Sequence, residues 1–253
     1  MQPREALSRA LTRTDGPALV AFVTAGYPQR ERFLEVLEEI EQAADAVEIG
    51  VPFTDPMADG VTIQRSSHAA LEQGVSLRWI LDQLAGRPDP SATPVLLMSY
   101  LNPLLAFGFD ALVDTAKAAG VSGLIVPDLP YEESAPFRAC LDGGGLALVQ
   151  MVTPVTPPER LRRLCRSSEG FVYAVTRTGI TGAQTELPAA LTDYLAAVKQ
   201  AAAVPVCAGF GVGERRQVEL IARHADGVIV GSALVEALER GESPGAFLNG
   251  LRP

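Results

Sequence analysis

Short apolar segments alternate with longer amphipathic segments along the whole chain. The apolar segments have the length of buried strands and are rich in β-branched residues. The segments that follow them repeat apolar residues three or four positions apart, as on one helix face; an example is residues 30–44, with Phe33, Val36, Leu37 and Ile40. The pattern predicts eight strands, at residues 18–25, 46–51, 94–100, 123–128, 146–153, 171–176, 205–210 and 227–233.

Strands that each precede a helix pair in parallel, with both faces covered. The 253 residues allow about 32 residues for each unit, which suits a closed barrel. An open doubly wound sheet is the alternative, but its glycine fingerprint is missing after the first strand, where the chain reads Ala25-Gly26-Tyr27-Pro28. We therefore expect an α/β protein in which residues 1–253 form a single (β/α)8 TIM barrel domain.

The first amphipathic segment precedes any strand. Residues 5–13 read EALSRALTR and predict an extra N-terminal helix. This helix has no strand of its own to cover, so we expect it to close the lower mouth of the barrel.

Charge and composition exclude several classes of function. The net charge of −9 disfavours binding to nucleic acid or to an anionic membrane. No apolar run is long enough to span a membrane, and the N-terminus lacks the apolar stretch of a secretory signal. The three cysteines, Cys140, Cys165 and Cys207, form no paired motif. We expect a cytoplasmic protein with reduced thiols.

Acidic residues follow the second predicted strand. Glu48 lies within an apolar run, where an ionised carboxylate is costly to bury without a partner. Asp55 and Asp59 come in the loop directly afterwards. Active sites of such barrels lie beyond the carboxyl ends of the strands, so these groups are candidates for acid–base chemistry. The alternative is a structural Glu48 paired with a neighbouring arginine or hydroxyl.

Glycine-rich loops follow the last three strands. The loop after the sixth, RTGITGAQT, has a length usual for lids, although a plain solvated linker fits its composition equally well. The loops after the seventh and eighth predict a phosphate site built from backbone N–H groups. Its candidate residues are Gly209, Gly211, Gly213, Gly231 and Ser232.

Metal chemistry has few candidate ligands in this sequence. The histidines, His68 and His224, have no ligand-like spacing to each other or to a cysteine, so no metal site is expected. The remaining prediction is acid–base chemistry on a phosphorylated molecule.

Several motifs together resemble the tryptophan synthase α subunit family. They are VEIGVPFTDPMADGVTIQ, MSYLNPLLAFG, GLIVPDLPYEE, VTPVTPPERL, YAVTRTGITGAQTELP and GFGV, and they occur in order over nearly the whole chain. The resemblance implies a barrel lyase that cleaves indole-3-glycerol phosphate to indole and glyceraldehyde 3-phosphate. It also implies a β-subunit partner in an α2β2 heterotetramer, with the pyridoxal phosphate held by that partner and no cofactor in this chain.

The resemblance also implies roles for individual residues. The catalytic pair of the family falls on Glu48 and Asp59, and its phosphate-binding positions fall on Gly182, Gly211, Gly231 and Ser232. We expect Thr181 to approach Asp59 when the lid closes. Strand-end positions expected to enclose the indole are Phe22, Leu97, Tyr100, Leu124, Tyr173 and Phe210. Cys207-Ala208 and Gly213, which flank the GFGV motif, depart from the commonest family pattern.

Two other functions remain open at this point. Another phosphate-binding barrel enzyme, such as an isomerase or epimerase, would be expected to carry metal-binding histidines or a Cys/Asp pair at strand ends. A non-catalytic barrel that only activates a β-type partner would be favoured by loss of either carboxylate, and both are present.

Overall fold

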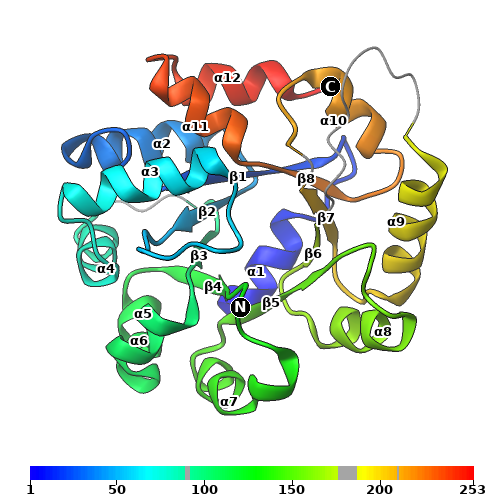
Figure 1. The fold of residues 1–253 in the computed structure, drawn as a ribbon, viewed down its shortest axis with the longest axis horizontal. Coiled ribbons are helices and arrows are strands. Elements are labelled where there is room, and N and C mark those ends of the chain that lie inside the picture. Colours follow the sequence, from blue (N-terminus) through cyan, green and yellow to red (C-terminus); the bar gives the residue numbers. More distant parts are fainter. Residues whose placement is uncertain (89–91, 176–186, 210) are drawn as a thin grey trace.

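A closed barrel of parallel strands forms the centre of the computed structural model, which describes residues 1–88, 92–175, 187–209 and 211–253 (Figure 1). Each strand pairs with the next, and β8 pairs with β1 to close the sheet. The strands are β1 (Ala18–Thr24), β2 (Ala46–Gly50), β3 (Val95–Met98), β4 (Val121–Ile125), β5 (Ala147–Val152), β6 (Val172–Val175), β7 (Val206–Gly209) and β8 (Gly227–Val230). The predicted (β/α)8 barrel is confirmed.

The strand ends differ from the sequence prediction by a few residues. β4 begins at Val121, two residues earlier than expected. β3 ends at Met98 rather than at residue 100, because Tyr100 already precedes the first turn of the next helix. Thr176 and Phe210, expected at two strand ends, lie outside the described residues.

Helices surround the barrel and cover its outer face (Figure 1). In the described part of the chain they are α1 (Pro3–Ala10), α2 (Phe33–Ala43), α3 (Val61–Glu72), α4 (Leu77–Ala85), α5 (Leu101–Phe107), α6 (Phe109–Ala118), α7 (Ala135–Gly144), α8 (Pro158–Ser167), α9 (Ala189–Ala201), α10 (Arg215–Ile221), α11 (Ser232–Glu239) and α12 (Pro244–Leu251). None of these helices is long and apolar enough to cross a membrane.

The strand residues pack in two separate hydrophobic cores. Alternate residues of β1 illustrate the division, since Leu19, Ala21 and Val23 join the outer core between strands and helices, whereas Ala18 and Val20 join the inner core. Side chains of a strand point alternately to its two faces, so a closed sheet has one inner and one outer set.

α1 closes the lower end of the inner core. Leu7 and Leu11 are fully buried there, against Phe171 and other residues that point into the barrel. Ser8 donates a hydrogen bond to the carbonyl of Gly170 at 2.7 Å. The expected N-terminal helix is confirmed, together with its place at the lower mouth.

Carboxylates bind the amino-terminal ends of three strands. Asp45, just before β2, accepts a hydrogen bond from the backbone N–H of Leu19 in β1 at 2.7 Å. Asp226 and Glu169, which precede β8 and β6, accept in the same way from Val206 at 2.8 Å and Leu148 at 3.1 Å. Each acceptor also pairs with a cation, which compensates for its partial burial.

Asp45 is the most connected of these carboxylates. Besides the N–H of Leu19, it binds Arg13 and Arg252, so it joins both terminal segments to the barrel. Its side chain is 10% exposed.

Asp45→Ala is expected to lower the free energy of unfolding by about 2–4 kcal/mol, because it leaves buried donors without an acceptor. Urea denaturation measures the change. Asp15→Ala is the control, since Asp15 also pairs with Arg13 but is 70% exposed, and it should have little effect. Equal effects of the two substitutions would contradict a special role for Asp45.

Candidate active site

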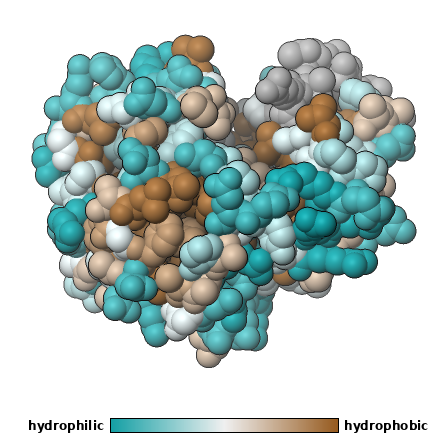
Figure 2. All heavy atoms as spheres, turned by 60° about the horizontal axis from the view of Figure 1, so that its bottom comes forward, coloured by the Kyte–Doolittle hydropathy of each residue, from teal (hydrophilic) through white to brown (hydrophobic). Residues whose placement is uncertain are grey.

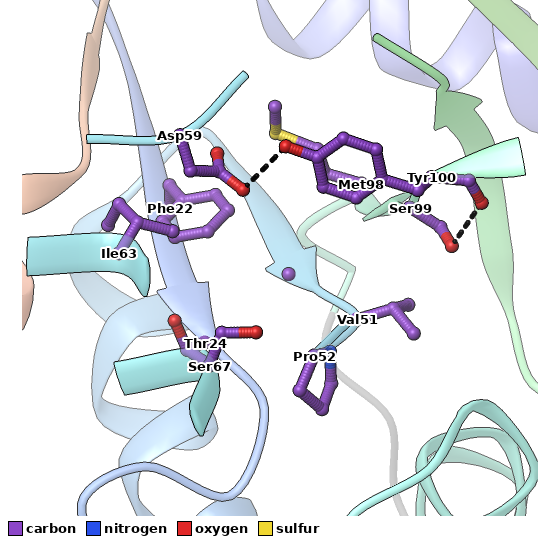
Figure 3. Close-up of a pocket in the computed structure, with 11 residues that line it drawn as sticks. Phe22, Thr24, Val51, Pro52, Asp59, Ile63, Ser67, Met98, Ser99 and Tyr100 are labelled. Carbon is purple, nitrogen blue, oxygen red and sulfur yellow. Dashed lines mark hydrogen bonds between the residues drawn. The ribbon is translucent and has the colours of Figure 1, made fainter. Parts of the chain in front are cut away.

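A hollow opens at the carboxyl-terminal ends of the strands. Its volume is about 280 Å³, and it reaches from the loop after β2 to the loops after β7 and β8. Its walls are formed by Phe22, Asp59, Gly60, Ile63, Met98, Tyr173, Gly209, Gly211, Ile229, Gly231 and Ser232. A smaller space of about 20 Å³ adjoins it beside Asp59 (Figure 3). The end of the barrel that carries this hollow is the end where barrel enzymes bind their substrates.

Glu48 points into the barrel below this hollow. Ala46 belongs to the inner core, and Glu48, two residues further along β2, lies on the same face of the strand. In the sheet it is the direct neighbour of Phe22 in β1 and of Leu96 in β3. The strand register therefore places an apolar residue on each side of Glu48, and Tyr173 and Cys207 are close enough to interact with its charge.

The Glu48 carboxyl group is fully buried and unpaired. Neither of its oxygens has a hydrogen-bond partner among the residues that the structure describes. Burial disfavours the charged form and raises the pKa of Glu48 to about 8. At neutral pH the group therefore holds a proton that it can donate. The ion-paired structural alternative for Glu48 is not supported by these contacts.

Asp59 lies on the rim of the hollow, directly before α3. The hydroxyl of Tyr100 donates a hydrogen bond to its carboxylate at 3.0 Å, and Figure 3 shows the two side chains pointing toward each other. Burial raises the pKa of Asp59 above its ordinary value, and the hydrogen bond from Tyr100 opposes that rise. Glu48 and Asp59 thus have different surroundings, as a division between proton donor and charge stabiliser requires.

The loop that carries Asp59 is fixed at several points. Tyr100 accepts a hydrogen bond from the backbone N–H of Ala58 at 2.9 Å, and its ring stacks on Phe53 with the centroids 5.2 Å apart. The hydroxyl of Ser67 in α3 accepts from the N–H of Phe53 at 2.9 Å. These contacts hold the loop between β3 and α3.

Asp55, the other acidic candidate in this loop, does not face the hollow. It is exposed, and it accepts a hydrogen bond from the neighbouring Thr54 hydroxyl. Of the two aspartates, only Asp59 contributes to the walls.

Phe22, Tyr100 and Tyr173 lie at the site, as expected for residues that would enclose an aromatic ring. Leu97 and Leu124 do not, and their proposed part in the indole wall is wrong. Both are fully buried in the outer core, between the strands and the helices. The interior positions are the next residues, Met98 and Ile125, because a step of one residue along a strand reverses the face.

Some wall residues were missed by sequence reasoning. Ile63 is in the first turn of α3, and Ile229 is an apolar strand residue like many others, so neither carries a signal of its own. The interior position of Met98 could have been predicted from the alternation of faces along β3, if one interior residue of that strand had been known.

The glycine-rich end of the hollow is formed by the loops after β7 and β8. Gly211 has a φ of +64°, a conformation that other residues rarely adopt, and Gly231 directly precedes the first turn of α11. Ser232 begins that helix, whose free N–H groups point toward the hollow, as anion binding requires. Gly209 must lack a side chain, because a Cβ there would lie 2.8 Å from the Tyr173 hydroxyl.

Three of the expected site residues, Thr181, Gly182 and Phe210, lie outside the described residues. Their expected roles in the lid, the phosphate site and the indole wall stay predictions.

Known proteins resemble this chain over most of its length. The family model described as tryptophan synthase alpha chain matches residues 9–247. The tryptophan synthase alpha chain of Nitratidesulfovibrio vulgaris strain DP4 is 43% identical over 233 residues, covering 92% of this chain and 91% of the relative. That of Xanthomonas oryzae pv. oryzae strain PXO99A is 46% identical over 224 residues, covering 87% and 84%.

Solved structures share the fold as well. Tryptophan synthase subunit alpha from Legionella pneumophila strain Paris superposes with a TM-score of 0.89 at 30% identity, covering 99% of this chain and 97% of the other. A chain of tryptophan synthase from M. tuberculosis superposes with a TM-score of 0.84 at 34% identity, covering 98% and 95%. By sequence and by structure, this chain belongs to the tryptophan synthase alpha chain family.

Proposed function

We propose that this chain is a tryptophan synthase α subunit that cleaves indole-3-glycerol phosphate to indole and glyceraldehyde 3-phosphate. The observation that carries the proposal is the buried carboxyl of Glu48, without a hydrogen-bond partner among the described residues, below a hollow lined by Asp59 and by the glycines after β7 and β8. Family membership supports it and argues against the isomerase alternative. The presence of both carboxylates argues against a barrel that only activates a partner.

The dimensions and chemistry of the hollow suit this substrate. Its phosphate would bind at Gly211, Gly231 and the first turn of α11, where backbone N–H groups neutralise charge. Its indole ring would lie between apolar walls, with the ring N–H directed to Asp59. The glycerol carbons then span the distance between the two ends.

The first step is protonation of the indole ring. Glu48 donates its proton to C3, the carbon that carries the glycerol chain, and the ring nitrogen becomes cationic. Asp59 accepts the hydrogen bond of this N–H, and its negative charge stabilises the cation in a site shielded from water. Because the Glu48 oxygens have no partner among the described residues, no hydrogen bond to these residues has to break for the side chain to turn toward the substrate.

The second step cleaves the carbon–carbon bond. The Glu48 carboxylate removes the proton of the hydroxyl on the side-chain carbon that is bonded to C3. The bond between C3 and this carbon then breaks, and the carbon becomes the aldehyde. The electrons of the broken bond restore the aromatic ring and neutralise the ring nitrogen. The proton given to C3 remains on indole. Glu48 ends the cycle protonated, in the state that burial favours.

An apolar surface close to the site supports a protein partner. Figure 2 shows hydrophobic residues gathered on the side of the molecule that carries α5 and α6. In α5, Leu105 is 54% exposed, and Leu101 and Phe107 are half-buried. We propose that this surface contributes to docking of a β subunit, which would hold the pyridoxal phosphate, in an α2β2 heterotetramer.

Other predictions accompany this function. We propose a cytoplasmic enzyme that needs no cofactor in this chain, and a single domain over residues 1–253. In the proposed cycle, the lid with Thr181 excludes water, and Gly182 contributes to the phosphate site.

Glu48→Gln is expected to lower the rate of indole release at least 100-fold, because the amide neither donates nor accepts the proton. Asp59→Asn should also be severe, since it removes the charge opposite the indole cation. Both are measured as indole formed from indole-3-glycerol phosphate, with circular dichroism to verify folding. A folded Glu48→Gln protein that retains more than about a tenth of wild-type turnover would refute the role of Glu48.

Glu48→Gln is also expected to raise the free energy of unfolding above that of the wild type, and this difference should grow with pH. The pKa of Glu48 rises from an ordinary value of 4.5 to about 8 on folding, so the folded state keeps a proton that the unfolded chain releases. The stability of the wild type therefore falls as pH rises between these two values, and glutamine does not titrate. Urea denaturation of the variant and the wild type near pH 5 and near pH 8 measures this difference at each pH. An equal difference in the free energy of unfolding at the two pH values would show that Glu48 is ionised in the folded barrel.

Leu105→Glu is expected to weaken β-subunit binding at least tenfold, because it places a charge in an apolar interface. Isothermal titration of a β subunit into each variant measures the affinity. Ala203→Glu, at an exposed position before β7 at the other end of the barrel, is the control and should bind as the wild type does. Unchanged affinity of the Leu105 variant would remove α5 from the interface.

A further inference from the structure

Two neighbouring helices both begin at the hollow. α3 starts at Val61, directly after Asp59 and Gly60, and α11 starts at Ser232, at the glycine-rich end. The two helices lie side by side on the outside of the barrel (Figure 1). Any link between them therefore connects the segment that carries Asp59 to the proposed phosphate site.

Two pairs of side chains form such a link. The hydroxyl of Thr62 in α3 donates to the Glu236 carboxylate in α11 at 3.0 Å. One turn further, Arg65 donates to both oxygens of Glu239, at 2.8 Å each from Nη2, with Nε also 3.0 Å from one of them. Residues three apart lie on one face of a helix, so both pairs lie on the facing sides of α3 and α11. We call these four residues the α3–α11 clamp.

Glu239 has a further partner outside the two helices. The hydroxyl of Tyr27, in the loop after β1, donates to it at 2.7 Å. The hydrogen bonds from Arg65 and Tyr27 hold the pKa of Glu239 below its usual range, so the carboxylate remains charged at neutral pH. Its side chain is 25% exposed, compared with 52% for Arg65.

α3 is in turn bonded to Asp59 itself. The side-chain amide of Gln64 donates to the backbone carbonyl of Asp59 at 2.9 Å and lies 3.4 Å from that of Pro56. Gly60, next to Asp59, accepts from the backbone N–H of Gln64 at 2.9 Å. A displacement of the first turn of α3 would therefore displace the Asp59 backbone.

We propose that the α3–α11 clamp makes the position of Asp59 depend on occupation of the phosphate site. This inference rests on the proposed function, because it takes the start of α11 as the place where phosphate binds. A phosphate there restrains α11, the clamp transmits the restraint to α3, and the Asp59 segment becomes ordered. Thr62, Arg65, Glu236 and Glu239 are then positioning residues that touch no part of the substrate.

The size of the effect follows from the exposure of the clamp. Ion pairs that are partly open to solvent contribute modestly, so loss of the clamp should lower kcat by no more than about fivefold. Phosphate affinity should change less than about twofold, because α11 and its glycines remain intact. We therefore expect loss of the clamp to lower kcat and to leave the affinity for phosphate nearly unchanged.

Hydrogen exchange with inorganic phosphate as the probe tests the coupling without catalysis. In the wild type, saturating phosphate should slow exchange of the backbone amides of residues 53–66, which comprise the Asp59 loop and the first turns of α3. In the double variant Thr62→Val/Arg65→Met this protection should be lost. Arg32→Met is the control, because it removes a similar exposed pair, Arg32 with Glu35 at 2.6 Å, away from the clamp.

Kinetics on the same proteins give a second readout. The double variant should show the reduced kcat with an unchanged inhibition constant for glycerol 3-phosphate. The exchanged pair Arg65→Glu/Glu239→Arg gives up the hydrogen bond from Tyr27 but restores an ion pair between α3 and α11, so it should recover part of the kcat that Arg65→Met loses.

The outcomes separate the two proposals. If the wild type binds no phosphate, the proposed phosphate site and the coupling both fail. If phosphate binds but residues 53–66 are protected equally in wild type and double variant, the coupling alone is refuted. A double variant with wild-type kcat would also refute it, whatever its thermal stability.

Discussion

The pairing of β1 with β8 closes the sheet and gives the strands one interior, and the other features follow from it. Ala18 lies opposite Gly227 in this pairing, and Ala21 lies opposite Val230. A closed sheet has no edge, so each strand residue faces either the interior or the helices. The interior is closed below by Leu7 of α1 and by Leu11, which directly follows this helix, and the hollow lies at its upper end.

This enclosure determines the chemistry of Glu48. A carboxyl on a strand of an open sheet would find water or a cation, whereas the barrel gives it apolar neighbours and no hydrogen-bond partner among the described residues. Burial of this carboxyl raises its pKa, so the fold is less stable at neutral pH than it is below the ordinary pKa of a glutamate. Asp45, Asp226 and Glu169, at the other end of the barrel, contribute stability through paired carboxylates, so the two ends of the same strands serve opposite purposes.

Much of this arrangement is predictable from the sequence, and the limits have physical causes. The eight strands, the N-terminal helix and the position of Glu48 follow from apolar patterning, which reports burial directly. The faces of Leu97 and Leu124 were assigned wrongly because both are apolar and their neighbours Met98 and Ile125 are apolar too, so hydrophobicity does not distinguish the two faces. The hydrogen bond from Tyr100 to Asp59 joins residues 41 positions apart, and only the folded barrel brings them together.

The closure of the barrel also bears on how the site comes into being during synthesis. Glu48 and Asp59 lie in the first quarter of the chain, whereas Gly231 and the strand that closes the sheet lie near residue 230. A nascent chain therefore carries both carboxylates long before the glycine-rich end of the hollow is synthesised. Contacts between such distant segments form slowly, because a long loop must close first. The walls of the hollow are therefore complete only when β8 has been synthesised and has paired with β1.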